Sequence, residues 1–344
     1  MKLTIGIIAL VVLATAMTSA PATGAQSNLP AQDTKRPRSS PTPPGQGQIV
    51  GEGDTIRIDS ELVALTATVT DSRGRSVSNL KQSDFAVYED GAKQELAYFN
   101  TGDRVPVSLG ILFDTSGSMI DKIEGVSDAV EHFVKSVAPG DEIFLIRFSD
   151  EAEIVQDFTD DRSRVLRTVE DLKPQGKTAL YDAIALGLQR VAQGRHQKRA
   201  LLLVTDGNDT TSSVKLETAL LLARRSEVII YAMGIGHGER GSFGHDQVKD
   251  EVDMKVLNAF AEATGGAAFF LENAHEGGRD RIDEAAAEVA AELKQQYTLG
   301  YRPTNRRKDG AFRHIKIELS DKSLRVRTKR GYYAPQDKST GLEE

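Results

Sequence analysis

The 344-residue sequence contains no cysteine. This absence excludes disulfide bonds, zinc sites built on thiolates and a lipid anchor attached to an N-terminal cysteine. The folded chain must therefore be stabilised by its hydrophobic core, with a bound metal on oxygen ligands as the remaining aid. An apolar fraction of 39% is sufficient to build such a core.

The sequence also lacks an excess of positive charge. It has 43 Lys and Arg against 50 Asp and Glu, a formal net charge of −7. A global basic field that would attract nucleic acid or an anionic membrane is thus absent. The most basic stretch, HIKIELSDKSLRVRTKRGYY near the C-terminus, is typical of a strand with a solvated Lys/Arg face. We expect no nucleic-acid partner.

Long apolar runs are scarce, and the clearest one is N-terminal. Lys2 is followed by an apolar run from Leu3 to Met17 and then by small residues. This pattern predicts a secretory signal peptide over residues 1–25, cleaved after Ala25, with an uncleaved anchor as the alternative. We expect an exported protein, periplasmic or secreted to the cell surface, with no stable membrane span after cleavage.

Two β-rich segments lie on either side of the central part of the chain. Residues 26–53 are rich in Pro, Gln and Ser and predict a disordered linker, and residues 337–344 predict a flexible tail. Residues 54–102 contain the alternating run LVALTATVT and the hairpin pattern FAVYEDGAKQELAYF. Residues 297–336 return to strand patterning, and we expect them to pack with 54–102 as one small module, because each piece alone is short for a core.

Residues 105–296 alternate strand and helix patterns. The runs VSLGILFD, EIFLIRFS, RALLLVTDG and EVIIYAMGIG are apolar on both faces, which is typical of buried parallel strands. Amphipathic segments lie between them. We therefore predict an α/β fold with a doubly wound, mostly parallel sheet flanked by helices, plus the small β-rich module formed by the segments before and after it.

Oxygen-bearing side chains follow two of the predicted strands. Asp114, Ser116 and Ser118 alternate directly after VSLGILF, and Asp206 closes the later run LLLVTD. Thr178, before the helix ALYDAI, can reach the same crevice, because ligands of α/β sheets bind beyond the carboxyl ends of strands. Two carboxylates and three hydroxyls form a hard-oxygen set, which suits Mg²⁺, Mn²⁺ or Ca²⁺. Capping and turn chemistry is the alternative for each acid taken singly.

The order and spacing of these residues resemble a known family of domains. The series Asp114-x-Ser116-x-Ser118, Thr178 in GKTALYDAI and Asp206 in VTDGND resembles the von Willebrand factor type A (VWA) domain and its metal-ion-dependent adhesion site. The resemblance implies that Ser116 and Ser118 bind the metal directly, Thr178 does so when a ligand is bound, and Asp114 and Asp206 act partly through water. It further implies Mg²⁺ as the cofactor and an Asp or Glu carboxylate of a partner protein as the last ligand.

The flanking β-rich segments are similar to those of an exported bacterial group of VWA-related proteins. The resemblance favours a metal-dependent protein-binding module for adhesion or assembly, and not an enzyme. The sequence lacks a G-x-S-x-G elbow and an H-E-x-x-H helix, and Asp171 stands where a phosphate-binding loop requires glycine. A structural envelope scaffold with a fold-stabilising metal is one alternative. A metal-dependent phosphotransferase or hydrolase is the other.

Two further features leave alternatives open. The loop from Gly236 to Met254 is long and contains His237 and His245, so it is either a solvated insertion or a border of the metal crevice with a weak metal site of its own. Asp121 is either a charge at the start of a helix or a ligand of a neighbouring metal site.

Overall fold

A computed structural model describes residues 62–101, 105–206, 208–236, 252–272 and 278–336. The expected signal peptide, linker and tail, and residues 237–251 of the long loop, lie outside these ranges. All described residues belong to one compact unit. Within the described ranges, no helix is both long and apolar enough to cross a membrane.

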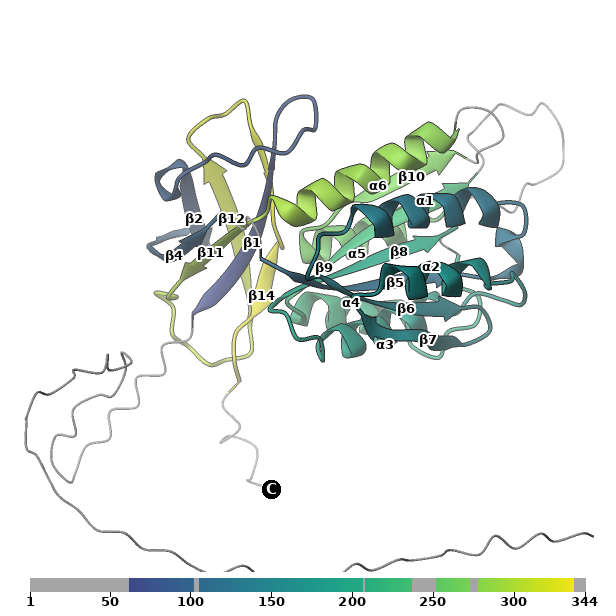
Figure 1. The fold of residues 1–344 in the computed structure, drawn as a ribbon. Helices are drawn as coiled ribbons and strands as arrows, with labels where there is room; N and C mark the ends of the chain where they lie inside the picture. Colours follow the sequence, from purple (N-terminus) through teal and green to yellow (C-terminus); the bar gives the residue numbers. More distant parts are fainter. Residues whose placement is uncertain (1–61, 102–104, 207, 237–251, 273–277, 337–344) are drawn as a thin grey trace, which may run out of the picture. The chain divides into compact units, whose positions relative to one another are not determined.

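A six-stranded sheet forms the centre of the larger domain (Figure 1), with the strand order β10-β9-β8-β5-β6-β7. Neighbouring strands are parallel except for β7, which runs antiparallel to β6. The strands are β5 (Val107–Asp114), β6 (Glu142–Phe148), β7 (Ala152–Thr159), β8 (Lys198–Thr205), β9 (Val228–Gly236) and β10 (Ala268–Glu272). β5 and β9 are buried along their whole length, as expected of central strands covered on both faces.

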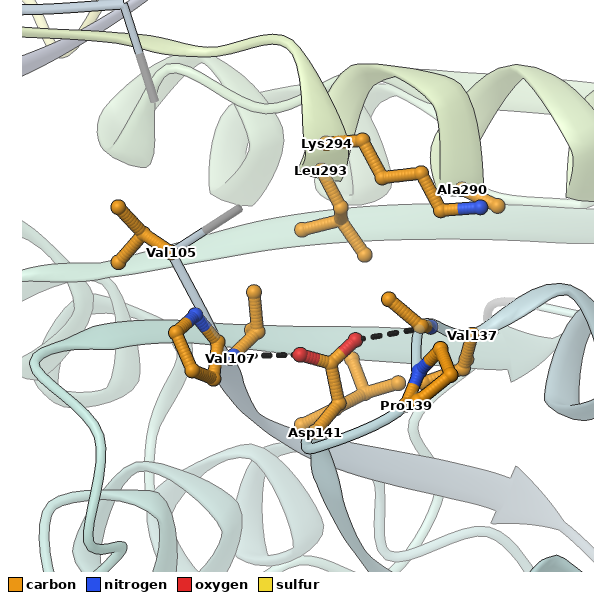
Figure 2. A pocket seen from close by; sticks show the side chains of 11 residues that line it. Val105, Val107, Val137, Pro139, Asp141, Ala290, Leu293 and Lys294 are labelled. Carbon is orange, nitrogen blue, oxygen red and sulfur yellow. Dashed lines mark hydrogen bonds between the residues drawn. The ribbon is translucent and has the colours of Figure 1, made fainter. Parts of the chain in front are cut away.

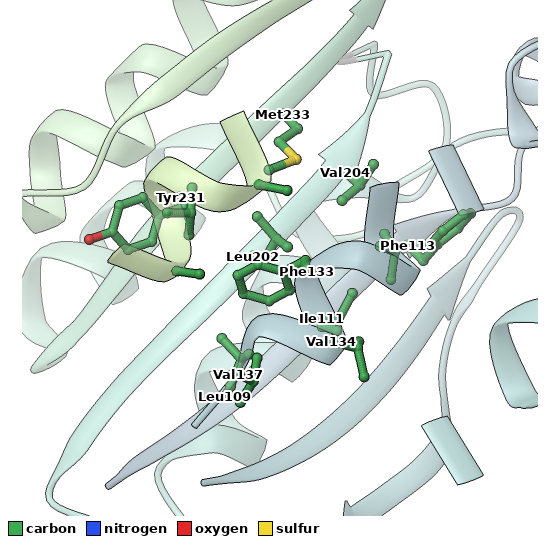
Figure 3. Close-up of a cluster of buried hydrophobic side chains, with 14 of the residues drawn as sticks. Leu109, Ile111, Phe113, Phe133, Val134, Val137, Leu202, Val204, Tyr231 and Met233 are labelled. Carbon is green, nitrogen blue, oxygen red and sulfur yellow. The ribbon is translucent and has the colours of Figure 1, made fainter. Parts of the chain in front are cut away.

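Helices cover both faces because strand residues alternate between them. On β5, Leu109, Ile111 and Phe113 pack with Phe133 and Val134 of α1, as Figure 3 shows, whereas Leu112 belongs to the core of the opposite face. The first face is covered by α1 (Ile123–Ser136), α2 (Arg162–Glu170) and α6 (Gly278–Lys294). The second is covered by α3 (Leu180–Val191), α4 (Leu216–Arg225) and α5 (Met254–Thr264).

The predicted doubly wound, mostly parallel sheet is confirmed, and one strand was missed. β7 was not predicted because its residues are only partly buried and its sequence, AEIVQDFT, has no continuous apolar run. Its pairing with the buried strand β6 makes it an edge strand, so it depends on a tertiary contact that the local sequence does not contain.

The smaller module consists of two four-stranded sheets, β13-β1-β11-β4 and β14-β12-β2-β3, in which all neighbours are antiparallel. The strands before the α/β domain are β1 (Val63–Thr70), β2 (Phe85–Glu89), β3 (Ala92–Gln94) and β4 (Leu96–Asn100). Those after it are β11 (Tyr297–Tyr301), β12 (Phe312–Leu319), β13 (Arg325–Arg327) and β14 (Gly331–Tyr333). Each sheet therefore combines strands from both flanking segments, as the predicted fold class requires.

The two sheets of the module share one core. Leu65 and Tyr297 from one sheet pack in the same buried cluster as Val87 and Ile317 from the other. The β2–β3 hairpin turns at Asp90 and Gly91, which have φ values of 47° and 83°. Positive φ at both positions is what an Asp-Gly hairpin turn supplies. A short 3₁₀ helix, η1 (Gln82–Asp84), precedes β2.

A buried ion pair joins this module to α6. The side chain of Glu292 is fully buried and pairs with Arg327 of β13, whose Nε also donates to the carbonyl oxygen of Gly265 at 3.1 Å. Burial raises the pKa of Glu292, and the charge of Arg327 opposes that rise. Within the described residues the second oxygen of Glu292 has no hydrogen-bond partner. The charge of Glu292 therefore relies mainly on Arg327, with a smaller contribution from a hydrogen bond with Tyr231.

We expect the Arg327→Met variant to lose about 3 kcal/mol in free energy of unfolding, because it leaves Glu292 buried without its cation. Glu292→Gln, which removes the charge but retains the volume, should lose less. The double variant should resemble Glu292→Gln alone. Urea denaturation of the four proteins measures the coupling. Costs that simply add in the double variant would contradict the dependence of Glu292 on Arg327.

Candidate functional site

The two predicted acids lie at one edge of the central sheet. Asp114 is the last residue of β5, and Asp206 directly follows β8. The two strands are parallel neighbours, with Phe113 paired to Val204. Asp114 is 0% and Asp206 is 4% exposed. Both carboxylates are thus held at the carboxyl ends of adjacent strands, in the position predicted from the sequence.

Asp114 connects the two strand ends. Its Oδ1 accepts a hydrogen bond from the backbone N–H of Ser116 at 2.8 Å, and its Oδ2 accepts one from the hydroxyl of Thr205 at 2.6 Å. The pKa of Asp114 is raised to about 6, mainly by burial and in part by the negative charge of Asp206, whereas the hydrogen bonds from Thr205 and Ser116 oppose the rise. Both oxygens of this carboxylate are therefore already oriented by the protein.

The two serines come together in the turn after β5. Ser116 precedes the 3₁₀ helix η2 (Gly117–Met119), and its Oγ lies 2.9 Å from the Oγ of Ser118. Ser116 is buried, whereas Ser118 is exposed. The alternation of Asp114, Ser116 and Ser118 thus forms a pair of adjacent hydroxyls that is open to solvent on the side of Ser118.

The loop that carries Thr178 is bonded to this turn. The N–H of Gln175 donates to the carbonyl of Thr115 at 2.7 Å, and the N–H of Gly117 donates to the carbonyl of Gly176 at 3.0 Å. Gly176 has a φ of 79°, and a Cβ there would lie 2.4 Å from Oδ2 of Asp150. Only glycine fits this position without displacement, because its backbone is left-handed and its neighbour is close.

Thr178 is in turn bonded to the loop that follows Asp206. Its N–H donates to the hydroxyl of Thr210 at 2.9 Å, and its carbonyl accepts from the N–H of Thr210 at 2.9 Å. The loops after β5, before α3 and after β8 therefore form one hydrogen-bonded unit. All five predicted residues, Asp114, Ser116, Ser118, Thr178 and Asp206, belong to it.

Two residues at this site were not predicted. Thr205 orients Asp114 through its hydroxyl. The Nζ of Lys122 donates to Oδ2 of Asp206 at 3.3 Å, and the side chains of Lys122 and Asp206 are 2% and 6% exposed. Strand alternation next to Asp206 could have suggested Thr205. The sequence carried no signal for Lys122, because the direction of its side chain depends on the turn that leads into α1.

The donor chemistry of this unit fits a hard divalent cation. Hydroxyl and carboxylate oxygens are the ligands that Mg²⁺, Mn²⁺ and Ca²⁺ prefer. Among the residues that the structure describes, no group of three or more His, Asp or Glu side chains gathers that could hold a metal. A site here would therefore depend on the hydroxyls as well as the two acids. Lys122 adds a buried positive charge to the unit, next to Asp206.

The remaining candidates lie around the site, at the far end of the sheet or outside the described residues. Asp121 is exposed and precedes α1, which begins at Ile123. His237 and His245 lie outside the described residues. A cavity of about 380 Å³ lies at the opposite end of the sheet, where β5 begins, and Val107, Val137 and Leu293 line it (Figure 2). Its carboxylate, Asp141, already accepts hydrogen bonds from the N–H groups of Val107 and Ala138, at 2.7 and 3.0 Å.

Comparison with known proteins gives one family match and several remote relatives. Residues 109–208 match the family model of the von Willebrand factor type A domain. An uncharacterized protein of Synechocystis is 27% identical over 181 residues, which cover 50% of this chain and 39% of the relative. An uncharacterized protein of Borreliella burgdorferi is 24% identical over 197 residues, which cover 53% of this chain and 58% of the relative. The match thus spans less than two thirds of either relative.

Solved structures with similarity to this chain include a von Willebrand factor type A protein from Catenulispora acidiphila. It has 14% identity and a TM-score of 0.47, and the match covers 74% of this chain and 75% of that one. The BatB protein of Bacteroides thetaiotaomicron has 18% identity and a TM-score of 0.44, with 55% and 99% covered. All five predicted site residues fall within residues 109–208. The prediction of a von Willebrand factor type A domain is confirmed for residues 109–208, which match the family model.

Proposed function

We propose that this chain is an exported, metal-dependent protein-binding module for adhesion or assembly. In this proposal a divalent cation, Mg²⁺ in the first place, binds at the carboxyl end of the sheet and accepts an Asp or Glu side chain of a partner protein. The observation that carries the proposal is the hydrogen-bonded unit of three loops that presents the paired hydroxyls of Ser116 and Ser118 beside Asp114.

Each residue has a distinct role in the proposed site. Ser116 and Ser118 would hold the cation directly, and Thr178 would join them when a ligand is bound. Asp114 and Asp206 would act through water, a role supported by the hydrogen bonds that already occupy both oxygens of Asp114. The bound cation supplies a coordination position for a carboxylate from outside the chain. Export is supported by the signal-peptide pattern of residues 1–25.

The buried charges argue against a purely structural metal. A carboxylate buried without a counter-charge would destabilise the fold and could make a metal necessary for folding. Lys122 already provides a cation to Asp206, and Thr205 and Ser116 already donate to Asp114. The fold therefore has internal partners for both acids, and it does not need a metal to satisfy them.

A thermal melt tests the proposed cation site. We expect Mg²⁺ or Mn²⁺, at about 100 times its dissociation constant, to add about 2.7 kcal/mol to the free energy of unfolding measured in EDTA. Asp114→Asn should lose this increment, because the neutral amide no longer attracts the cation. Glu124→Gln is the matched control, since it removes an exposed acid from the nearby first turn of α1, and it should retain the increment. An equal increment in Asp114→Asn would contradict the proposed site.

Ser116→Ala separates the ligand-binding role from a scaffold role. The variant loses one hydroxyl and its contact with Ser118, so in EDTA we expect a loss of only about 1 kcal/mol in the free energy of unfolding. Binding of Mn²⁺, followed by the electron paramagnetic resonance signal of the free ion, should fall at least about tenfold. An Ser116→Ala protein that does not fold in EDTA would instead support the scaffold alternative.

A further inference from the structure

Lys122 is a cation fixed inside the proposed site. Its Nζ lies 3.3 Å from Oδ2 of Asp206, and its side chain is 2% exposed. The backbone on both sides is anchored: the N–H of Lys122 donates to the carbonyl of Met119 at 3.0 Å, and its carbonyl accepts from the N–H of Val126 at 3.1 Å. Lysine side chains ordinarily extend their ammonium into water. Here the start of α1 directs the ammonium inward.

The charges of the site can be counted with and without this lysine. The carboxylates of Asp114 and Asp206 and the ammonium of Lys122 sum to −1. A bound dication would change the sum to +1, and an added carboxylate ligand would restore it to zero. Without Lys122, the two carboxylates and the dication would already be neutral, and a carboxylate ligand would leave an excess negative charge.

We propose that Lys122 is a fixed counter-charge that makes the binding of the cation and of the partner's carboxylate mutually dependent. This inference rests on the proposed function and adds a specific property to it. The ammonium repels the cation and so weakens its binding to the free protein. The same positive charge, in a site with little exposure to water, favours an anionic ligand once the cation is present. Because linkage is reciprocal, the carboxylate tightens cation binding by the same factor.

A consequence is that the free protein would bind its cation weakly and the complex would bind it tightly. Such a site selects acidic partners over neutral ones, because a neutral ligand leaves the positive charge uncompensated. Lys122 is thus a specificity-determining residue, although it binds neither the cation nor the ligand directly.

The test compares Mn²⁺ binding by the full chain and its Lys122→Met variant, measured from the electron paramagnetic resonance signal of free Mn²⁺ at pH 7.5. Each protein is titrated alone, with a short peptide that contains one Glu, and with the same peptide carrying Gln. We expect Lys122→Met to bind Mn²⁺ alone at least about tenfold more tightly than the wild type. The Glu peptide should tighten Mn²⁺ binding about fivefold or more in the wild type and less than about twofold in the variant. The Gln peptide should have no effect.

Two variants serve as controls. Lys177→Met also removes one positive charge, from the loop next to Thr178. Because Lys177 is exposed to solvent, this variant should bind Mn²⁺ with the affinity of the wild type. Lys122→Arg retains the charge and should retain the coupling between Mn²⁺ and the Glu peptide. Circular dichroism confirms that each variant is folded before titration.

The outcomes separate the inference from the proposed function. Equal Mn²⁺ affinities of the wild type and Lys122→Met would overturn the inference, even if Asp114→Asn abolishes binding in both backgrounds. Full coupling to the Glu peptide in Lys122→Met would also overturn it. Mn²⁺ binding that survives Asp114→Asn would overturn the proposed function itself, since the ion would then lie elsewhere.

Discussion

The parallel pairing of β5 with β8 is the constraint on which the site depends. The pairing runs from Val107 opposite Lys198 to Phe113 opposite Val204, so the two strands end together. Asp114 and Asp206 then emerge side by side, and Thr205 can reach Oδ2 of Asp114. A shift of one residue in this register would turn Thr205 to the other face of the sheet, away from Asp114. The hydrophobic alternation that fixes the register, with Ile111 and Leu202 in the same core, therefore also fixes the site.

A buried carboxylate is paired with a basic side chain at both ends of the larger domain. Asp206 is paired with Lys122 at the carboxyl end of the sheet, and Glu292 is paired with Arg327 at the junction with the β-module. Each pair places one fully or almost fully buried acid against a cation from another segment. A buried pair of this kind is weak evidence for added stability, but the loss of one partner is costly. Both pairs thus fix how segments meet, one at the site and one at the junction.

The sequence contained enough information for the sheet and for most of the site. Continuous apolar runs identify the buried strands, and Gly265 ends α5 with a φ of 82°, as a glycine after a helix predicts. The positions of Asp114, Ser116, Ser118, Thr178 and Asp206 followed from strand ends and loop positions. The edge strand β7 could not be predicted, because it forms only by pairing with β6. The role of Lys122 could not be predicted either, because the direction of its side chain depends on the folded turn before α1. The cation remains a prediction, since its binding depends on the balance of charges around Asp206.

The β-module can be assembled from two distant segments because the α/β domain begins and ends at the same place. Val107 at the start of β5 and Leu293 near the end of α6 line one cavity (Figure 2), so the chain leaves the module and returns to it within a short distance. Only Gln295 and Gln296 separate α6 from β11, and Gln296 donates to the hydroxyl of Tyr231 at 2.9 Å. The site lies at the other end of β5, about 25 Å away for eight residues of extended strand. The module is thus attached at one end of the sheet, and the proposed cation site lies at the other end, away from the module.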